Sequence, residues 1–191
     1  MYGMVIQGAQ DLLVSLGGDA LWEQVLADAG LEGSVFAATT TYDDAVVYRL
    51  VASASTVTGL TQPEVLRALG RHWVLFTGSS GWGHLFDIAG DDLRSFIAGL
   101  DALHMRLQTV MTEIRAPSFD VEVIGDHELE VLYRSDREHL APMVAGLLEG
   151  MAELFEESWD IVQIEERSDA STAVFLLTER TLVAADPHSV R

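Results

Sequence analysis

The segment HELEVLYRSDR, residues 127–137, alternates apolar and polar side chains with a period of two. That period is typical of a β-strand with one buried face. If the strand runs to its end, the face that carries Val131 continues into Tyr133, Ser135 and Arg137. An arginine on a core-directed face is costly unless it is paired, and its planar fork matches a carboxylate. The segment therefore predicts both a sheet and a polar site at one end of it.

The spacing of these three polar residues leaves two interpretations open. Positions i, i+2 and i+4 of a strand spread two hydroxyls and a guanidinium over roughly 13 Å, enough to reach two carboxylates on one ligand. Alternatively, Arg137 pairs with one of the chain's own acidic side chains while Tyr133 simply packs in the core.

The sequence on both sides of this segment completes a sheet. FDVEVIG, residues 119–125, alternates in the same way, and a turn at Gly125 and Asp126 predicts a hairpin. After a helical stretch at about 140–155, two further strands are predicted at the end of the chain, DIVQIEER and TAVFLLTER. These elements predict a four-stranded antiparallel sheet with packed helices.

The first two thirds of the chain has helical periodicity. We expect helices at 3–16, 19–30, 42–59 and 61–78, and a long one that begins at Asp91 or Asp92 and ends before Pro117. The predicted fold class is α+β, a helical lobe at about 1–60 followed by an α+β lobe at about 61–181 and a tail at about 182–191. A length of 191 residues fits one such domain.

Composition excludes several classes of function. With 30 acidic and 11 basic residues the formal net charge is −19, so we expect no nucleic-acid partner. The chain contains no Cys and no Lys, which rules out thiolate metal sites, thioether-linked haem and lysine chemistry. No basic leader and no apolar run of about 18 residues is present, so we expect no membrane span and a cytoplasmic protein.

The long helix carries one histidine in its apolar stripe. His104 falls between Leu100 and Leu107, at the spacing of the face that is directed to the core. It is either a core histidine bonded to a neighbouring carbonyl or an axial ligand to an iron in an apolar pocket.

Other local motifs are weaker. GSSGWG at 78–83 fits neither a nucleotide loop nor a serine elbow and is interpreted as a turn. Asp43 and Asp44 are interpreted as a helix start, and Trp73, Trp82 and Met143 as core positions.

An ordered set of fragments resembles the haem nitric oxide/oxygen binding (H-NOX) family, which includes bacterial gas sensors and the β subunit of soluble guanylate cyclase. The fragments are MYG, YDDAVVYRLVASAS, VLRALGRHWV, GDDLRSFIAGLDALH, RAPSFD and YRSDREHLAPMVAGLLEGM, and together they span most of the chain.

The resemblance implies roles for named residues. His104 would bind the haem iron, and Tyr133, Ser135 and Arg137 would hold the two propionates. Pro117 and the residue at the position of Val5 would press on the porphyrin from opposite sides. The fragment RAPSF has Ala116 where RPPxF is commoner, but it keeps this proline. The helical lobe would lie distal to the haem and the α+β lobe proximal. The cofactor implied is non-covalent haem b, iron protoporphyrin IX.

Oxygen-binding members of that family place a tyrosine over the iron from the helix that follows the Tyr-Ser-Arg strand. Residues 138–158 contain no Tyr. We therefore expect a distal pocket lined by Val5, Ala9, Trp73, Met143 and Leu147 that binds nitric oxide and carbon monoxide and discriminates against oxygen. Only His139 and the Trp73 indole are predicted donors that could reach this pocket.

The function predicted is a non-catalytic gas sensor that signals to a separate protein, which the family pattern suggests is a histidine kinase or a cyclic-di-GMP enzyme. Two alternatives stay open. One is a haem-dependent peroxidase-like enzyme, against which the apolar distal helix and the lack of Cys argue. The other is a haem-free module that binds a small dicarboxylate or a protein partner through Arg137.

Overall fold

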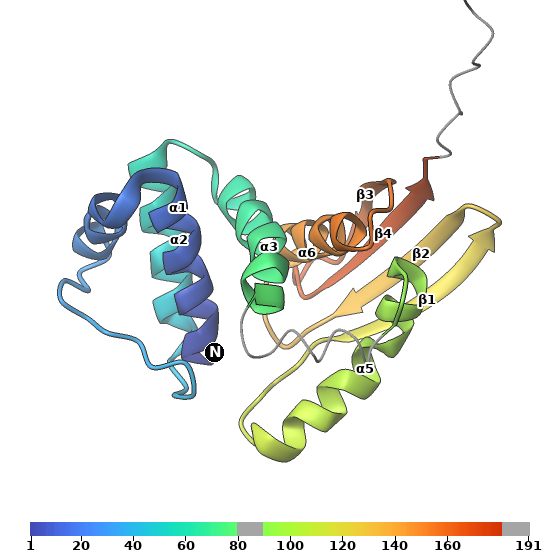
Figure 1. Ribbon diagram of the computed structural model, residues 1–191, viewed down its shortest axis with the longest axis horizontal. Helices are drawn as coiled ribbons and strands as arrows, with labels where there is room; N and C mark the ends of the chain where they lie inside the picture. Colours follow the sequence, from blue (N-terminus) through green and yellow to red (C-terminus); the bar gives the residue numbers. More distant parts are fainter. Residues whose placement is uncertain (80–89, 181–191) are drawn as a thin grey trace, which may run out of the picture.

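The computed structural model describes residues 1–79 and 90–180, and these residues have the α+β fold predicted from the sequence (Figure 1). The described part contains five helices and one four-stranded antiparallel sheet. None of these helices is both long and apolar enough to span a membrane. The turn predicted around Trp82 and the predicted tail at 182–191 lie outside the described residues.

The N-terminal lobe is built from α1 (Gly3–Asp28) and α2 (Asp44–Thr58). Helix α1 is broken where two helices were predicted to meet, at Gly17 and Gly18, because Gly18 has a φ of 72°, which favours glycine. Asp43 caps α2 by accepting a hydrogen bond from the backbone N–H of Ala45 at 2.8 Å. The buried core of this lobe includes Ile6, Leu13, Trp22, Val25, Phe36, Val47 and Leu50.

Helix α3 (Gln62–Ser79) belongs to both hydrophobic cores, because Val65 lies in the N-terminal core and Val74 in the C-terminal one. It packs closely against α6 (Ala141–Leu154). A Cβ on Gly146 would lie 2.0 Å from the Arg67 carbonyl oxygen, so only glycine permits this approach of the two backbones.

The sheet has the strand order β1-β2-β4-β3. Its strands are β1 (Ser118–Gly125), β2 (Glu128–Arg134), β3 (Trp159–Glu166) and β4 (Thr172–Glu179). One face carries fully buried side chains from the two central strands: Leu129, Val131, Phe175 and Leu177. Helix α5 (Leu93–Val110) packs against β1, and α6 packs against β3 and β4. The buried face is therefore directed at these two helices.

Most boundaries differ from the prediction by only one or two residues, and two of the differences shape the site. Helix α5 ends at Val110 rather than before Pro117, and residues 111–117 continue as irregular chain. The hairpin turn falls at 126–127, one residue later than predicted. Strand β2 ends at Arg134, because the Ser135 hydroxyl accepts the Arg137 backbone N–H at 3.1 Å and turns the chain.

Candidate functional site

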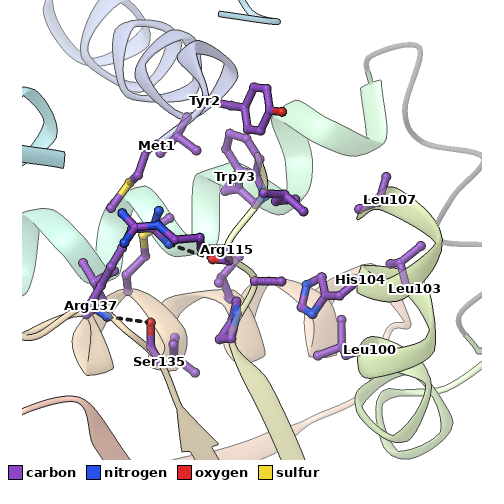
Figure 2. Close-up of a pocket in the computed structure, with 18 of the residues that line it drawn as sticks. Met1, Tyr2, Trp73, Leu100, Leu103, His104, Leu107, Arg115, Ser135 and Arg137 are labelled. Carbon is purple, nitrogen blue, oxygen red and sulfur yellow. Dashed lines mark hydrogen bonds between the residues drawn. The ribbon is translucent and has the colours of Figure 1, made fainter. Parts of the chain in front are cut away.

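A largely apolar cavity of about 500 Å³ lies between the two hydrophobic cores (Figure 2). Its wall takes side chains from α1, α3, α5 and α6, from the irregular segment 111–117 and from the end of β2. Cavities that bind small molecules and cofactors usually measure about 300–1,000 Å³ and carry a few placed polar groups. The size and lining of this cavity are those of a cofactor site.

His104 projects into the cavity from α5, beside Leu100, Leu103 and Leu107 (Figure 2). The helix that carries it starts at a capping box in which Asp92 and Ser95 bond to each other's backbone N–H. One turn before His104, the Asp101 carboxylate accepts the Phe119 backbone N–H at 3.0 Å, which ties α5 to β1. The position of the imidazole is therefore set by the strand as well as by its own helix.

The His104 imidazole is suited to bind a metal. Its Nδ1 atom is buried and makes no hydrogen bond to any described residue. Burial lowers the pKa of His104, although the Asp101 carboxylate and the Pro117 backbone partly oppose this shift. The ring is consequently neutral near pH 7, and neutral imidazole is the form that ligates metals. The Pro117 backbone acts on this ring, as expected for a core histidine, and the cavity beside the ring leaves room for an axial ligand's role.

Tyr133, Ser135 and Arg137 line the same cavity, and Figure 2 shows Ser135 and Arg137 across it from His104. Tyr133 is only 2% exposed and lies 5.6 Å from Phe119 between ring centroids. Burial raises the pKa of the Tyr133 phenol, while the Ser135 hydroxyl and the Arg137 charge oppose the rise. Tyr133 therefore reaches the cavity from strand β2, whereas Arg137 reaches it from the turn that follows β2.

Arg137 is paired with the chain's own carboxylate, as the second interpretation of the sequence proposed. Its Nε donates to Asp44 Oδ2 at 2.8 Å, and its Nη1 donates to the Arg115 carbonyl at 2.7 Å. Asp44 also bonds the Met1 ammonium at 2.6 Å and the Arg115 guanidinium at 2.8 Å. Two of the five guanidinium N–H donors of Arg137 are used in this way, which leaves donors for a second carboxylate.

All nine residues predicted for the site line this cavity. They are Val5, Trp73, His104, Pro117, Tyr133, Ser135, Arg137, Met143 and Leu147. Ala9, expected beside them, lies instead on a separate apolar cavity of about 30 Å³ that also touches Val5. His139 is 73% exposed and does not line the larger cavity. Its positive φ of 61° places it in the turn before α6.

Sequence reasoning missed two parts of the site. Thr77 is a buried residue of the cavity wall, and its position four residues after Trp73, one turn further along α3, could have indicated this. Asp44 was interpreted only as a helix start. Its contact with Arg137 joins residues 93 positions apart, and no spacing in the sequence predicts it.

Comparison with known proteins identifies the family. A sequence model of the family described as "Haem-NO-binding" matches residues 2–163. The chain belongs to the haem-NO-binding family. This haem-NO-binding chain is 28% identical over 179 residues to soluble guanylate cyclase gcy-35 of Caenorhabditis elegans, covering 92% of this chain and 26% of that protein. It is 31% identical over 124 residues to guanylate cyclase soluble subunit beta-2 of Rattus norvegicus, covering 61% and 18%. The chain thus spans about a quarter, or less, of the length of these relatives.

Solved structures show the same fold. An H-NOX protein from S. oneidensis in the Fe(II)NO ligation state superposes with a TM-score of 0.84, at 18% identity and with coverage of 95% of this chain and 100% of that one. An unliganded Fe(II) H-NOX point mutant from K. algicida gives 0.83 at 20% identity, with coverage of 96% and 98%. These likenesses show that the chain has the fold of the H-NOX proteins.

The residues of this haem-NO-binding chain fit a haem. The cavity offers the His104 imidazole, an apolar wall and, away from the imidazole, a guanidinium with donors to spare. These features are the ones that a haem requires. Its iron needs a donor atom, its macrocycle an apolar slot, and its two carboxylates cationic partners.

Proposed function

We propose that the chain binds non-covalent haem b and senses nitric oxide and carbon monoxide. One observation carries the proposal: the His104 imidazole, whose pKa is lowered by burial, lines an apolar cavity that has an arginine with spare donors on another wall. Haem, when bound, supplies a ferrous iron with an open position for a diatomic gas. Without Cys in the chain, no thioether attachment is possible.

The chain's own residues hold the cofactor at two ends. His104 would hold the iron through its imidazole, and its ring lies beside that of Phe119, with 6.3 Å between the ring centroids. Tyr133, Ser135 and Arg137 receive the propionates, the guanidinium providing a charge-assisted bond in a mostly apolar setting. Pro117 and Val5, both on the cavity wall, set the shape of the macrocycle.

Gas discrimination follows from the character of the distal wall. Bound oxygen carries partial negative charge and needs a hydrogen-bond donor, whereas nitric oxide and carbon monoxide do not. The wall formed by Val5, Met143 and Leu147 is apolar, and α6 contains no tyrosine. Donors on the described part of the cavity wall include the Trp73 indole and the hydroxyls of Thr77 and Tyr2. We propose that none of them stabilises oxygen, so that the site favours the other two gases.

We propose that the signal would begin at His104, the residue that would hold the iron. The first half of α5 is anchored by its capping box and by three buried side chains, Leu93, Phe96 and Ile97. The second half is less buried, since Leu103 is its one buried residue and Met105 is 63% and Val110 76% exposed. Release of His104 would therefore free the end of α5 and segment 111–117 while the start stays in place, a two-state change that a partner can detect.

The output is a separate signalling protein, for which a histidine kinase or a cyclic-di-GMP enzyme is proposed, and the chain itself is a non-catalytic sensor in the cytoplasm. The lobe at about 1–60 would lie distal to the haem and that at about 61–181 proximal, followed by the tail. The peroxidase alternative is disfavoured, because the wall formed by Val5, Met143 and Leu147 is apolar.

The test is a series of absorption spectra of the haem-loaded ferrous protein under argon, air, carbon monoxide and nitric oxide. We expect new Soret bands with the last two gases and none from a stable oxygen complex. A stable oxygen complex in air would refute the discrimination argument. Failure to take up hemin at all would refute the proposal and favour a haem-free module that binds through Arg137, and rapid peroxide turnover with a reducing dye would favour the peroxidase alternative.

A further inference from the structure

The sheet has a second face, which no described helix covers. Because side chains alternate along strands, residues paired with Leu132 in β2 share its face, away from α5 and α6. Leu132 pairs with Val174, and in the next row Leu176 pairs with Val162. These four side chains form one contiguous apolar patch, in which Val162 is 55% exposed and the others are partly exposed. We call the surface they form the outer sheet face.

Acidic side chains surround this patch. Asp120 and Glu122 lie beside it on β1, Glu128 and Glu130 on β2, and Asp160 and Glu165 on β3. Only Asp120 and Asp160 have ion-pair partners among the described residues, namely Arg134 and Arg180.

One cross-strand pair on this face is unfavourable in the free chain. Glu122 and Glu130 lie directly opposite each other on β1 and β2. Like charges at directly opposite positions destabilise a strand pair. An apolar patch beside uncompensated carboxylates is also unusual for a solvent face, where polar side chains normally alternate outward. A partner that covers the four apolar side chains and places positive charge beside the surrounding carboxylates would remove both unfavourable features.

We propose that the outer sheet face docks a partner protein whose surface presents apolar side chains ringed by Arg and Lys. Charge complementarity decides the occupant: a second copy of this chain, with a net charge of −19, would set carboxylates against carboxylates. An anionic membrane surface is disfavoured for the same reason. The partner is thus a basic protein surface.

The cavity and this face share one strand. Phe119, in β1, contacts the rings of His104 and Tyr133 and gives its backbone N–H to Asp101 of α5. Its neighbour Asp120 lies on the outer sheet face. A change in the position of α5 therefore acts on β1, whose acidic side chains form part of the docking rim. That this face carries the gas signal rests on the proposed function, whereas binding of a basic partner does not.

The test uses the full chain and a defined probe, a helical peptide of about 20 residues with leucines at i, i+3, i+4 and i+7 flanked by arginines. Binding is measured by calorimetry and mapped by amide chemical shifts. We expect shifts confined to β1–β4 and affinity that falls about tenfold between low and high salt. A matched peptide with glutamate in place of arginine should not bind.

Two pairs of variants locate the site. V162T/L176T removes apolar surface with a residue that suits strands and should weaken binding about tenfold or more. E122Q/E130Q should weaken binding and flatten its salt dependence, whereas E23Q/D28N, the same charge change on exposed positions of α1, should alter neither. Hemin uptake, read from the Soret band, checks that each variant is folded.

Several results would overturn the proposal. They are no binding, shifts that map elsewhere, equal effects of E122Q/E130Q and E23Q/D28N, or a dimer of the chain that V162T/L176T dissolves. The two proposals fail separately, since H104G should lose the iron ligand yet still bind the peptide, and the outer-face variants should bind the peptide weakly yet keep normal spectra.

Discussion

Replacing Asp44 by Asn should destabilise the haem-free chain by about 2 kcal/mol. Asp44 joins the N-terminal lobe to Arg137 and Arg115, and it also bonds the Met1 ammonium. Exposed ion pairs contribute about 0.2–1 kcal/mol, whereas removing one partner of a fully buried pair costs about 3–5 kcal/mol. The Asp44 and Arg137 side chains are 19% and 12% exposed, so their pair lies between these limits. The Arg115 side chain is 56% exposed and adds little.

The assay is urea unfolding at pH 7 followed by circular dichroism. For a domain of this size, about 2 kcal/mol corresponds to a fall in Tm of about 4–8 °C. D43N is the matched control, because it removes the neighbouring charge yet keeps a side chain that caps α2 well. If D44N unfolds within about 0.5 kcal/mol of D43N, the ion-pair cluster does not hold the lobes together and the reasoning fails.

The same residue predicts a pH dependence. Burial alone would raise the pKa of Asp44, but bonds to the Met1 ammonium and Arg137 outweigh it and hold this pKa below its usual range. A carboxyl with a depressed pKa in the folded state adds stability that is complete above the unfolded pKa and is lost as pH falls through the folded one. The difference between wild type and D44N should therefore persist at neutral pH and shrink below about pH 4.

Three further predictions concern packing, titration and the distal wall. Gly146→Ala puts a Cβ 2.0 Å from the Arg67 carbonyl oxygen, and no side-chain rotation can relieve this clash with the backbone. We expect the free energy of unfolding in urea to fall by about 3 kcal/mol or more. An unchanged unfolding midpoint would contradict the close packing of α3 on α6. Burial lowers the pKa of His104, so the unfolded chain binds a proton on this ring more readily than the folded chain does. The haem-free protein should therefore lose stability as pH falls below about 6.5. His104→Leu should remove this part of the pH dependence of stability, and a variant with the wild-type pH dependence would contradict a neutral ring in the folded chain. Trp73→Phe removes the indole N–H and one ring of this side chain from the cavity wall. It should leave carbon monoxide affinity within about twofold, and a larger change would mean that Trp73 shapes the gas site.

Local periodicity accounts for what the sequence could predict. The alternation through Tyr133 predicted β2 and its buried face, and the 3.6-residue stripe predicted that His104 faces inward from α5. Both patterns indicate which side of a helix or strand faces the core, and the cavity lies within the core, so a side chain on that side can line it. The break in α1 was likewise readable, because Gly17 and Gly18 interrupt an otherwise regular pattern.

What the sequence could not predict depends on contacts between distant segments. Arg137 was expected on the strand, but the Ser135 hydroxyl turns the chain, and the Arg137 side chain then reaches Asp44 from a loop. The end of α5 at Val110 was also not predicted, because the apolar stripe continues to Ile114 in the sequence. In the structure, Met111 and Ile114 line the cavity from an irregular segment rather than from the helix. The spacing of apolar residues indicates which side chains are buried, but it does not indicate which distant residues they contact.

The most direct measurement of the central claim compares wild type with H104G, each reconstituted with hemin, reduced, and recorded by absorption spectroscopy with and without imidazole. If His104 is the protein's ligand to iron, H104G should lose the wild-type ferrous spectrum and regain it only when imidazole fills the space of the missing ring. A ferrous spectrum of H104G that matches wild type without imidazole would contradict the account.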